Sequence, residues 1–206
     1  MQVATDLPIC IDSPSVHVLK EVLPLIKRSG IINSVSGEGE KCEVIFPLLQ
    51  GNDWKIIALM CDDEGIPSQV DRKIEIAVRI IEKAAKYGIQ PDRIFIDPLV
   101  LSLSAVNHAM LDFMEAIRII KSKYPNVRTT SGLSNISYGV PSRKIINMNF
   151  LTLALSAGMD SAIIDPTNKD VYATILAAEA LLNKDKYLRK YSNAYRAGKI
   201  GPIKPR

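Results

Sequence analysis

The stretch that decides the fold is Arg93-Ile-Phe-Ile-Asp97-Pro98-Leu-Val-Leu101. It is an apolar run, which is typical of a strand buried on both faces in a parallel sheet. Its one acidic residue, Asp97, stands where the run meets a proline. In open α/β sheets ligands bind outside the carboxyl ends of the strands. We therefore expect Asp97 to lie at a ligand site.

The same arrangement recurs along the chain. A polar residue closes four more runs: Ile9-Cys-Ile-Asp12, Ile31-Ile32-Asn33, Gly132-Leu-Ser-Asn135 and Ile163-Ile164-Asp165. Because the carboxyl ends of parallel strands meet at one edge of a sheet, these positions predict a single site facing that edge. Asp and Asn, with almost no His or Cys, favour hydrogen bonding to a heterocycle over binding of a metal.

Strand-like and helix-like segments alternate about six times, which predicts a parallel sheet with helical crossovers. The expected strands are Ile9–Asp12, Gly30–Ser34, Lys55–Cys61, Arg93–Leu101, Arg128–Asn135 and Ser161–Asp165. The expected helices are Val16–Lys27, Val70–Tyr87, Ala109–Tyr124, Phe150–Ala157 and Val171–Leu182. Two architectures fit this order: an open doubly wound sheet, and a (β/α)8 barrel with units missing. A full barrel typically needs about 250 residues and eight units.

The composition is that of a soluble globular protein, with 47% hydrophobic and 23% charged residues. No segment approaches the ~18 consecutive apolar residues of a membrane span. The start of the chain, Met1–Pro8, has neither the charged nor the apolar region of a signal peptide. Three cysteines without CxxC spacing exclude a disulfide framework or a zinc knuckle. We expect a cytoplasmic protein with no membrane partner.

The net charge of +4 over 206 residues comes from one end of the chain. Residues 184–206 carry eight basic residues and one acidic residue, so the remainder has 18 basic and 21 acidic residues and a net charge of −3. We interpret residues 1–206 as a single domain and residues 184–206 as its basic C-terminal helix and tail. The acidic body argues against nucleic-acid binding. The basic end is either a solvated surface or a docking surface for an acidic protein.

The strand-end residues have a structural alternative, because Asp and Asn also favour turns and helix caps. Asp12-Ser13-Pro14 is compatible with a helix start, and Asp97-Pro98 with a turn. The segment Gly132–Gly139 runs from a strand into a loop that precedes Arg143. The amide of Asn135 can donate or accept a hydrogen bond, which suits a ring nitrogen that changes protonation. Arg143 suits an anionic group such as a carboxylate.

Taken in order, six motifs resemble the methyltetrahydrofolate:corrinoid protein methyltransferases, the pterin-binding relatives of dihydropteroate synthase. The resemblance extends from Leu7 to about Asn183. The motifs are Cys-Ile-Asp12-Ser, Ile-Ile-Asn33-Ser, Gly65-Ile-Pro67, Phe-Ile-Asp97-Pro-Leu, Gly-Leu-Ser-Asn135-Ile-Ser and Arg143-Lys-Ile-Ile-Asn147. It implies a TIM-barrel-like (β/α) repeat, here an incomplete barrel with about six of eight strands, that pairs into a homodimer and needs no metal of its own.

The resemblance also implies roles for individual residues. Asp12, Asn33 and Asp97 would hold the pyrimidine edge of the pterin, together with Gly132 and Ser134. Asn135 would bind N5 and act as the catalytic residue, while Arg143 and Ser137 would contact the benzoyl-glutamate tail or the corrinoid. The implied reaction moves the N5 methyl group between methyltetrahydrofolate and the cobalt of a corrinoid (cobalamin) on a partner protein.

The chain departs from the family in two respects. The first two βα units of the family are expected to be absent, so that a second chain would cover the open edges or the missing part would lie elsewhere. Tyr138 stands where some members have a smaller or an amide residue. Two other functions remain open: a dihydropteroate synthase-type enzyme, for which Ser142-Arg143-Lys144 is a weak match, and a truncated, non-catalytic pterin-binding or assembly protein.

Overall fold

The computed structural model describes residues 5–202. The first four residues of the segment examined for a signal peptide, and the last four of the expected basic tail, lie outside this range. The chain divides into two compact units. Unit 1 comprises the residues up to Leu99 together with Glu115–Thr130, and unit 2 comprises Val100–Met114 and the residues from Ser131 onward.

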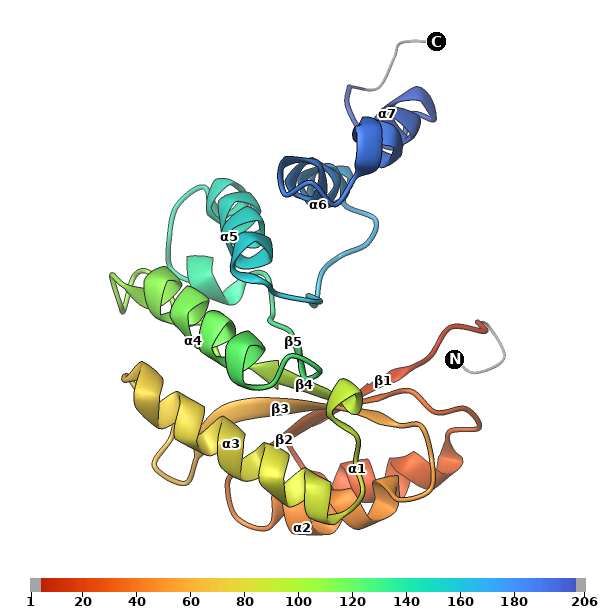
Figure 1. The fold of residues 1–206 in the computed structure, drawn as a ribbon, viewed down its shortest axis with the longest axis vertical. Helices are drawn as coiled ribbons and strands as arrows, with labels where there is room; N and C mark the ends of the chain where they lie inside the picture. The colour runs from red at the N-terminus through yellow and green to blue at the C-terminus, as the bar shows by residue number, and fades with distance from the viewer. Residues whose placement is uncertain (1–4, 203–206) are drawn as a thin grey trace. The chain divides into compact units, whose positions relative to one another are not determined.

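Unit 1 is built on a parallel sheet of five strands (Figure 1). The strands are β1 (Cys10–Asp12), β2 (Ile31–Gly37), β3 (Lys55–Asp62), β4 (Ile94–Asp97) and β5 (Arg128–Thr129). Their order in the sheet is their order in the chain, β1-β2-β3-β4-β5. A doubly wound sheet reverses its strand order at a switch point, whereas a (β/α) barrel adds each strand beside the last. The sheet therefore has the winding of part of a barrel.

Helices of unit 1 cover one face of this sheet (Figure 1). They are α1 (Val16–Val22), α2 (Lys41–Ile45) and α3 (Val70–Lys86), with 3-10 turns at Leu23–Leu25, Phe46–Leu49 and Pro91–Arg93. Alternate strand residues such as Ile32, Ile56 and Ile96 point into the core and are fully buried. Burial of each such side chain contributes about 1.5–3 kcal/mol.

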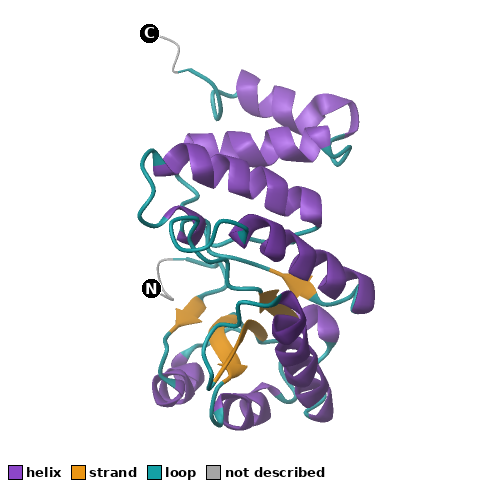
Figure 2. Cartoon of the chain, turned by 90° about the vertical axis from the view of Figure 1, so that its left-hand side faces the viewer, coloured by secondary structure: helices purple, strands orange, loops and turns teal. Residues whose placement is uncertain are grey.

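Unit 2 is mainly helical (Figure 2). Its helices are α5 (Arg143–Ala157), α6 (Lys169–Leu181) and α7 (Arg189–Arg196), with 3-10 turns at Asn135–Ser137 and Lys186–Leu188. Helix α4 (Ala109–Lys123) begins in unit 2 and ends in unit 1. Helix α6 packs against α5 and α7. Among residues 5–202, no helix combines the length and the apolar content needed to cross a bilayer.

The structure differs from the sequence expectations at several places. The strand expected at Arg93–Leu101 is the shorter β4, which ends at Asp97, and α2 was not expected. Helix α5 begins at Arg143, whereas the sequence predicted a start at Phe150. The prediction was late because polar residues between these two positions interrupt the apolar spacing by which a helix is recognised. The strand expected at Arg128–Asn135 is regular only over its first two residues. The strand expected at Ser161–Asp165 is reduced to one parallel bridge between Gly132 and Ile163.

Candidate functional site

Three of the polar residues predicted for the site lie on one face of the unit 1 sheet. Asp12 pairs in register with Asn33, and Asn33 with Ile57. Ile57 in turn lies beside Phe95, two residues before Asp97. Because side chains alternate along a strand, Asp12, Asn33 and Asp97 share the face opposite the helices. Asp12 and Asp97 end β1 and β4 as the sequence predicts, whereas Asn33 lies within β2, which continues to Gly37.

The three side chains differ in exposure. Asp12 is exposed, Asn33 is partly buried, and Asp97 is only 6% exposed. Burial raises the pKa of the Asp97 carboxyl to about 6, against the opposing effects of the Leu99 N–H and the charge of Lys73. At neutral pH this carboxyl is therefore mostly an anion, held in a largely dehydrated place where its hydrogen bonds count for more.

A tight turn after β4 fixes the position of Asp97. The Leu99 N–H donates a hydrogen bond of 2.8 Å to Asp97 Oδ1. Leu99 has φ 55°, a left-handed conformation that is unfavourable for a β-carbon-bearing residue. Lys73 of α3 donates to the Pro98 carbonyl at 2.7 Å and to the Leu99 carbonyl at 3.1 Å. The turn expected at Asp97-Pro98 is present. It bonds Oδ1 of Asp97, and the second carboxylate oxygen makes no hydrogen bond to this turn.

Of the remaining predicted residues, Gly132, Ser134, Asn135 and Ser137 lie in one loop of unit 2. Asp165 lies outside this loop, and its Oδ1 accepts the Thr167 N–H at 2.9 Å. Asn135 is exposed at the start of a 3-10 turn. A β-carbon on Gly132 would stand 3.4 Å from Asn135 Nδ2, so the glycine leaves room for the amide. Ser137 is fully buried, and its hydroxyl donates to the Ser134 carbonyl at 3.1 Å. The loop therefore presents Asn135 outward on a rigid base.

Arg143 secures this loop. Its Nε donates to Ser137 Oγ at 3.0 Å, and its Nη2 donates to the Ser134 carbonyl at 2.8 Å. Two of the five guanidinium donors are thus used within the loop, and the others remain for a ligand. Arg143 was predicted as a cation for an anionic tail; the structure adds a bracing role that the sequence did not indicate.

A cavity of about 500 Å³ adjoins this loop within unit 2. Its lining includes Ser134, Arg143 and Asn147. The side-chain oxygen of Asn147 is buried and has no hydrogen-bond partner among the described residues. Asn147 belongs to one of the six sequence motifs but was not predicted as a site residue; its place one helical turn after Arg143 was the available signal.

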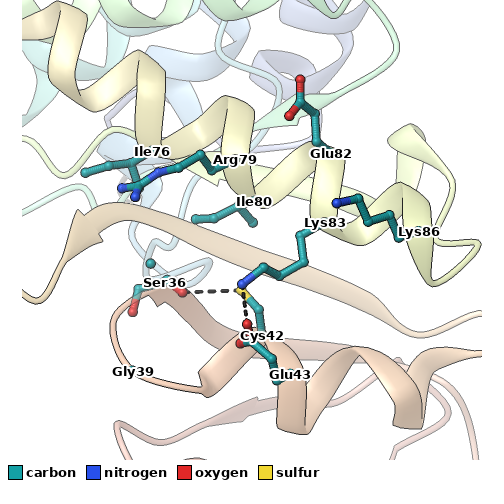
Figure 3. Close-up of a pocket in the computed structure, with 11 residues that line it drawn as sticks. Ser36, Gly39, Cys42, Glu43, Ile76, Arg79, Ile80, Glu82, Lys83 and Lys86 are labelled. Carbon is teal, nitrogen blue, oxygen red and sulfur yellow. Dashed lines mark hydrogen bonds and ion pairs between the residues drawn. The ribbon is translucent and has the colours of Figure 1, made fainter.

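A second cavity, of about 260 Å³, lies between α2 and α3 in unit 1 (Figure 3). Two of its basic side chains are already paired: Lys83 with Glu43 across the cavity, and Arg79 with Asp62 at 2.7 Å. Burial raises the pKa of the Cys42 thiol in its wall to about 12, so this thiol is inert. Within residues 5–202, no cluster of three or more His, Cys, Asp or Glu side chains is arranged to hold a metal ion.

The family is defined by sequence comparison. The family described as "Pterin binding enzyme" matches residues 1–165, and this chain belongs to it. The matched range covers strand-end residues of both units, from Asp12 to Asp165.

Three relatives place the chain within this family. It is 49% identical over 205 residues to the methylcorrinoid:tetrahydrofolate methyltransferase of Eubacterium limosum, covering 98% of this chain and 76% of that protein. It is 34% identical to the methionine synthase of Mycobacterium leprae over 170 residues, which are 77% of this chain and 14% of that protein. The Mycobacterium tuberculosis methionine synthase is also 34% identical, over 173 residues. The similarity thus extends over nearly the whole chain.

Solved structures confirm the fold. Dihydropteroate synthase from Xanthomonas albilineans, in complex with 7,8-dihydropteroate, aligns with TM-score 0.63 at 16% identity, over 88% of this chain and 71% of that one. The Yersinia pestis dihydropteroate synthase aligns with TM-score 0.65 at 14% identity, over 88% and 69%. Together with the sequential strand order, these matches confirm the prediction of a TIM-barrel-like (β/α) repeat present as part of a barrel.

Proposed function

We propose that this protein is a methyltransferase that moves the N5 methyl group between methyltetrahydrofolate and the cobalt of a corrinoid carried by a partner protein. The observation that carries the proposal is the 49% identity, over 98% of the chain, to a methylcorrinoid:tetrahydrofolate methyltransferase. That name gives the direction from methylcorrinoid to tetrahydrofolate, and we propose the same direction here. The likeness to dihydropteroate synthases, at 14–20% identity, concerns the fold alone.

Asp12, Asn33 and Asp97 are proposed to hold the pyrimidine edge of the pterin. This edge carries neighbouring N–H donors, which a carboxylate can accept with two oxygens, and a carbonyl, to which an amide can donate. The support in the structure is their common face on β1, β2 and β4 of one parallel sheet. Gly132 and Ser134 are proposed as further contacts of the pterin.

Asn135 is proposed to act on N5, the reacting nitrogen. In the proposed direction the N5 lone pair forms the bond to the methyl carbon. The cobalt–carbon bond breaks with its electron pair left on cobalt, and the N5 proton leaves to solvent. N5 is most positive while it carries both the methyl group and the proton. A hydrogen bond from N5–H to the Asn135 amide oxygen stabilises that charge more than the ground state, which is the requirement for catalysis.

The other elements of the proposal concern the assembly. Residues 1–206 act as one pterin-binding domain, with residues 184–206 as its basic C-terminal helix and tail. Arg143 uses its remaining donors, with Ser137, for the benzoyl-glutamate tail or the corrinoid. The enzyme works in the cytoplasm as a homodimer with a corrinoid protein as partner, without a metal of its own.

The function is tested by anaerobic methyl transfer from free methylcobalamin to tetrahydrofolate, followed by the visible spectrum of the corrinoid. We expect transfer by the wild type. Asn135→Ala should lower the transfer rate on the order of 100-fold, with a change in tetrahydrofolate affinity of only a few-fold. Asn149→Ala is the matched control, because that exposed amide bonds only the Ile145 carbonyl of its own helix.

Two results would contradict the proposal, one its methyl-transfer reaction and the other the catalytic role of Asn135. No transfer by a folded wild type that binds tetrahydrofolate would favour the non-catalytic alternative. Equal losses of rate and affinity in Asn135→Ala would show that Asn135 only binds the pterin.

A further inference from the structure

Lys73 is a buried cation that the proposed chemistry does not use. It lies in the first turn of α3 and is 5% exposed. Lysine is rarely buried to this extent, because removing its ammonium from water is costly unless hydrogen bonds compensate. Here its Nζ donates to two backbone carbonyls, those of Pro98 and Leu99. An apolar side chain at this position would leave the Pro98 and Leu99 carbonyls without this donor.

The two carbonyls held by Lys73 belong to the turn that orients Asp97. Leu99 keeps its left-handed backbone there, and its N–H donates to Asp97 Oδ1. An unfavourable backbone conformation persists only where its surroundings fix it. Lys73 therefore acts on Asp97 through the turn whose two carbonyls it holds.

The same cation also acts on Asp97 through its charge. Each element beside Asp97 contributes a neighbour: β3 places Leu59 in register with it, β5 places Arg128 beside Phe95 on the same face, and α3 contributes Lys73. Of these, Lys73 is the buried charge, and it lowers the pKa of Asp97 while burial raises it. Charges interact more strongly in a buried place than at an exposed surface such as that around Arg128.

We propose that Lys73 is a positioning residue that keeps Asp97 ionised and oriented to accept the N–H groups of the pterin. The inference rests on the proposed function for its ligand, but the coupling between Lys73 and Asp97 exists in the free protein. Lys73 therefore sets the pH range in which the pterin binds, without touching the pterin.

The test uses Lys73→Met, which keeps most of the length of the side chain and removes its charge. Carboxyl ¹³C NMR of the ligand-free protein measures the titration midpoint of Asp97, assigned with Asp97→Asn. Calorimetry measures tetrahydrofolate binding between pH 6 and 9. Lys86→Met, at the exposed end of the same helix, is the matched control. Lys73→Arg retains the charge, and Lys73→Gln keeps a donor without charge should Lys73→Met fail to fold.

We expect the Asp97 midpoint to rise by one to two pH units in Lys73→Met or Lys73→Gln and to stay near the wild-type value in Lys73→Arg and Lys86→Met. A rise of two units would weaken tetrahydrofolate binding about tenfold at pH 7, since the ionised fraction falls accordingly. Affinity should return toward the wild-type value at pH 9, a recovery that lost packing alone would not produce.

An unchanged Asp97 midpoint, or a loss of affinity that is equal at every pH, would overturn the role of Lys73. A wild type that binds no tetrahydrofolate, together with a raised midpoint in the variants, would overturn the proposed function and leave the coupling intact. The two failures are therefore distinguishable.

Discussion

Replacing Asp97 by Asn should make the protein more stable at alkaline pH. Burial raises the pKa of this carboxyl from its usual 3.8 to about 6. The native state therefore resists losing the proton that the unfolded chain gives up near pH 4. The stability that the protonated Asp97 carboxyl contributes is fully present below about pH 4, and it is lost as the pH rises through about 6. The difference of about two pH units corresponds to about 3 kcal/mol at pH 8. A neutral Asn avoids this cost and can still accept the Leu99 N–H.

The assay is urea denaturation of the wild type and Asp97→Asn at several pH values. The variant should be more stable by up to about 3 kcal/mol at pH 8 and by roughly half as much at pH 5. Asp92→Asn, which changes an exposed carboxyl just before β4, should show no such dependence. A stability difference that is constant from pH 5 to 8, or a variant less stable than wild type at pH 8, would refute the reasoning.

Three other changes test separate parts of the structure. Gly30→Ala should destabilise unit 1 by about 1–3 kcal/mol in urea denaturation, because a β-carbon would stand 2.1 Å from the Ile9 carbonyl oxygen; an unchanged midpoint would refute this. Asn168→Ala removes the cap that accepts the Asp170 and Val171 N–H groups, and should cost about 0.5–2 kcal/mol, with Asn168→Asp restoring most of it in thermal melting. Arg143→Met should speed hydrogen exchange in residues 132–138 while leaving α3 unchanged, and equal exchange in both proteins would contradict the bracing role.

Much of the fold was predictable because its strands are buried and its helices are periodic. The run through Phe95 to Asp97 and the periodic helix that ends before Gly88 were both identified from the sequence. The choice between a barrel and a doubly wound sheet did not follow from periodicity, since strand order depends on contacts far apart in the chain; the family resemblance predicted the barrel. The polar start of α5 was missed because Asn147 and Asn149 interrupt the apolar period that identifies a helix.

The candidate site was predicted in part. Asp12 and Asn33 were expected to lie together, and the parallel register of β1 and β2 pairs them directly. Lys73 was missed although a signal existed: it occupies the apolar face of its helix, one turn before Ala77 and two before Ile80. A lysine there must find hydrogen-bond acceptors in the interior, and those acceptors are backbone carbonyls that no sequence pattern marks. The bracing role of Arg143 was missed for the same reason, because its acceptor at Ser134 is a backbone carbonyl.

The most direct test of the account is a calorimetric titration of the 206-residue chain with methyltetrahydrofolate at pH 8. The account predicts saturable binding of one pterin per chain, abolished by Asp97→Ala and retained by Asp92→Ala. Absence of binding by a wild type that unfolds cooperatively, or binding that Asp97→Ala leaves intact, would contradict the claim that the strand-end carboxylate holds the pterin.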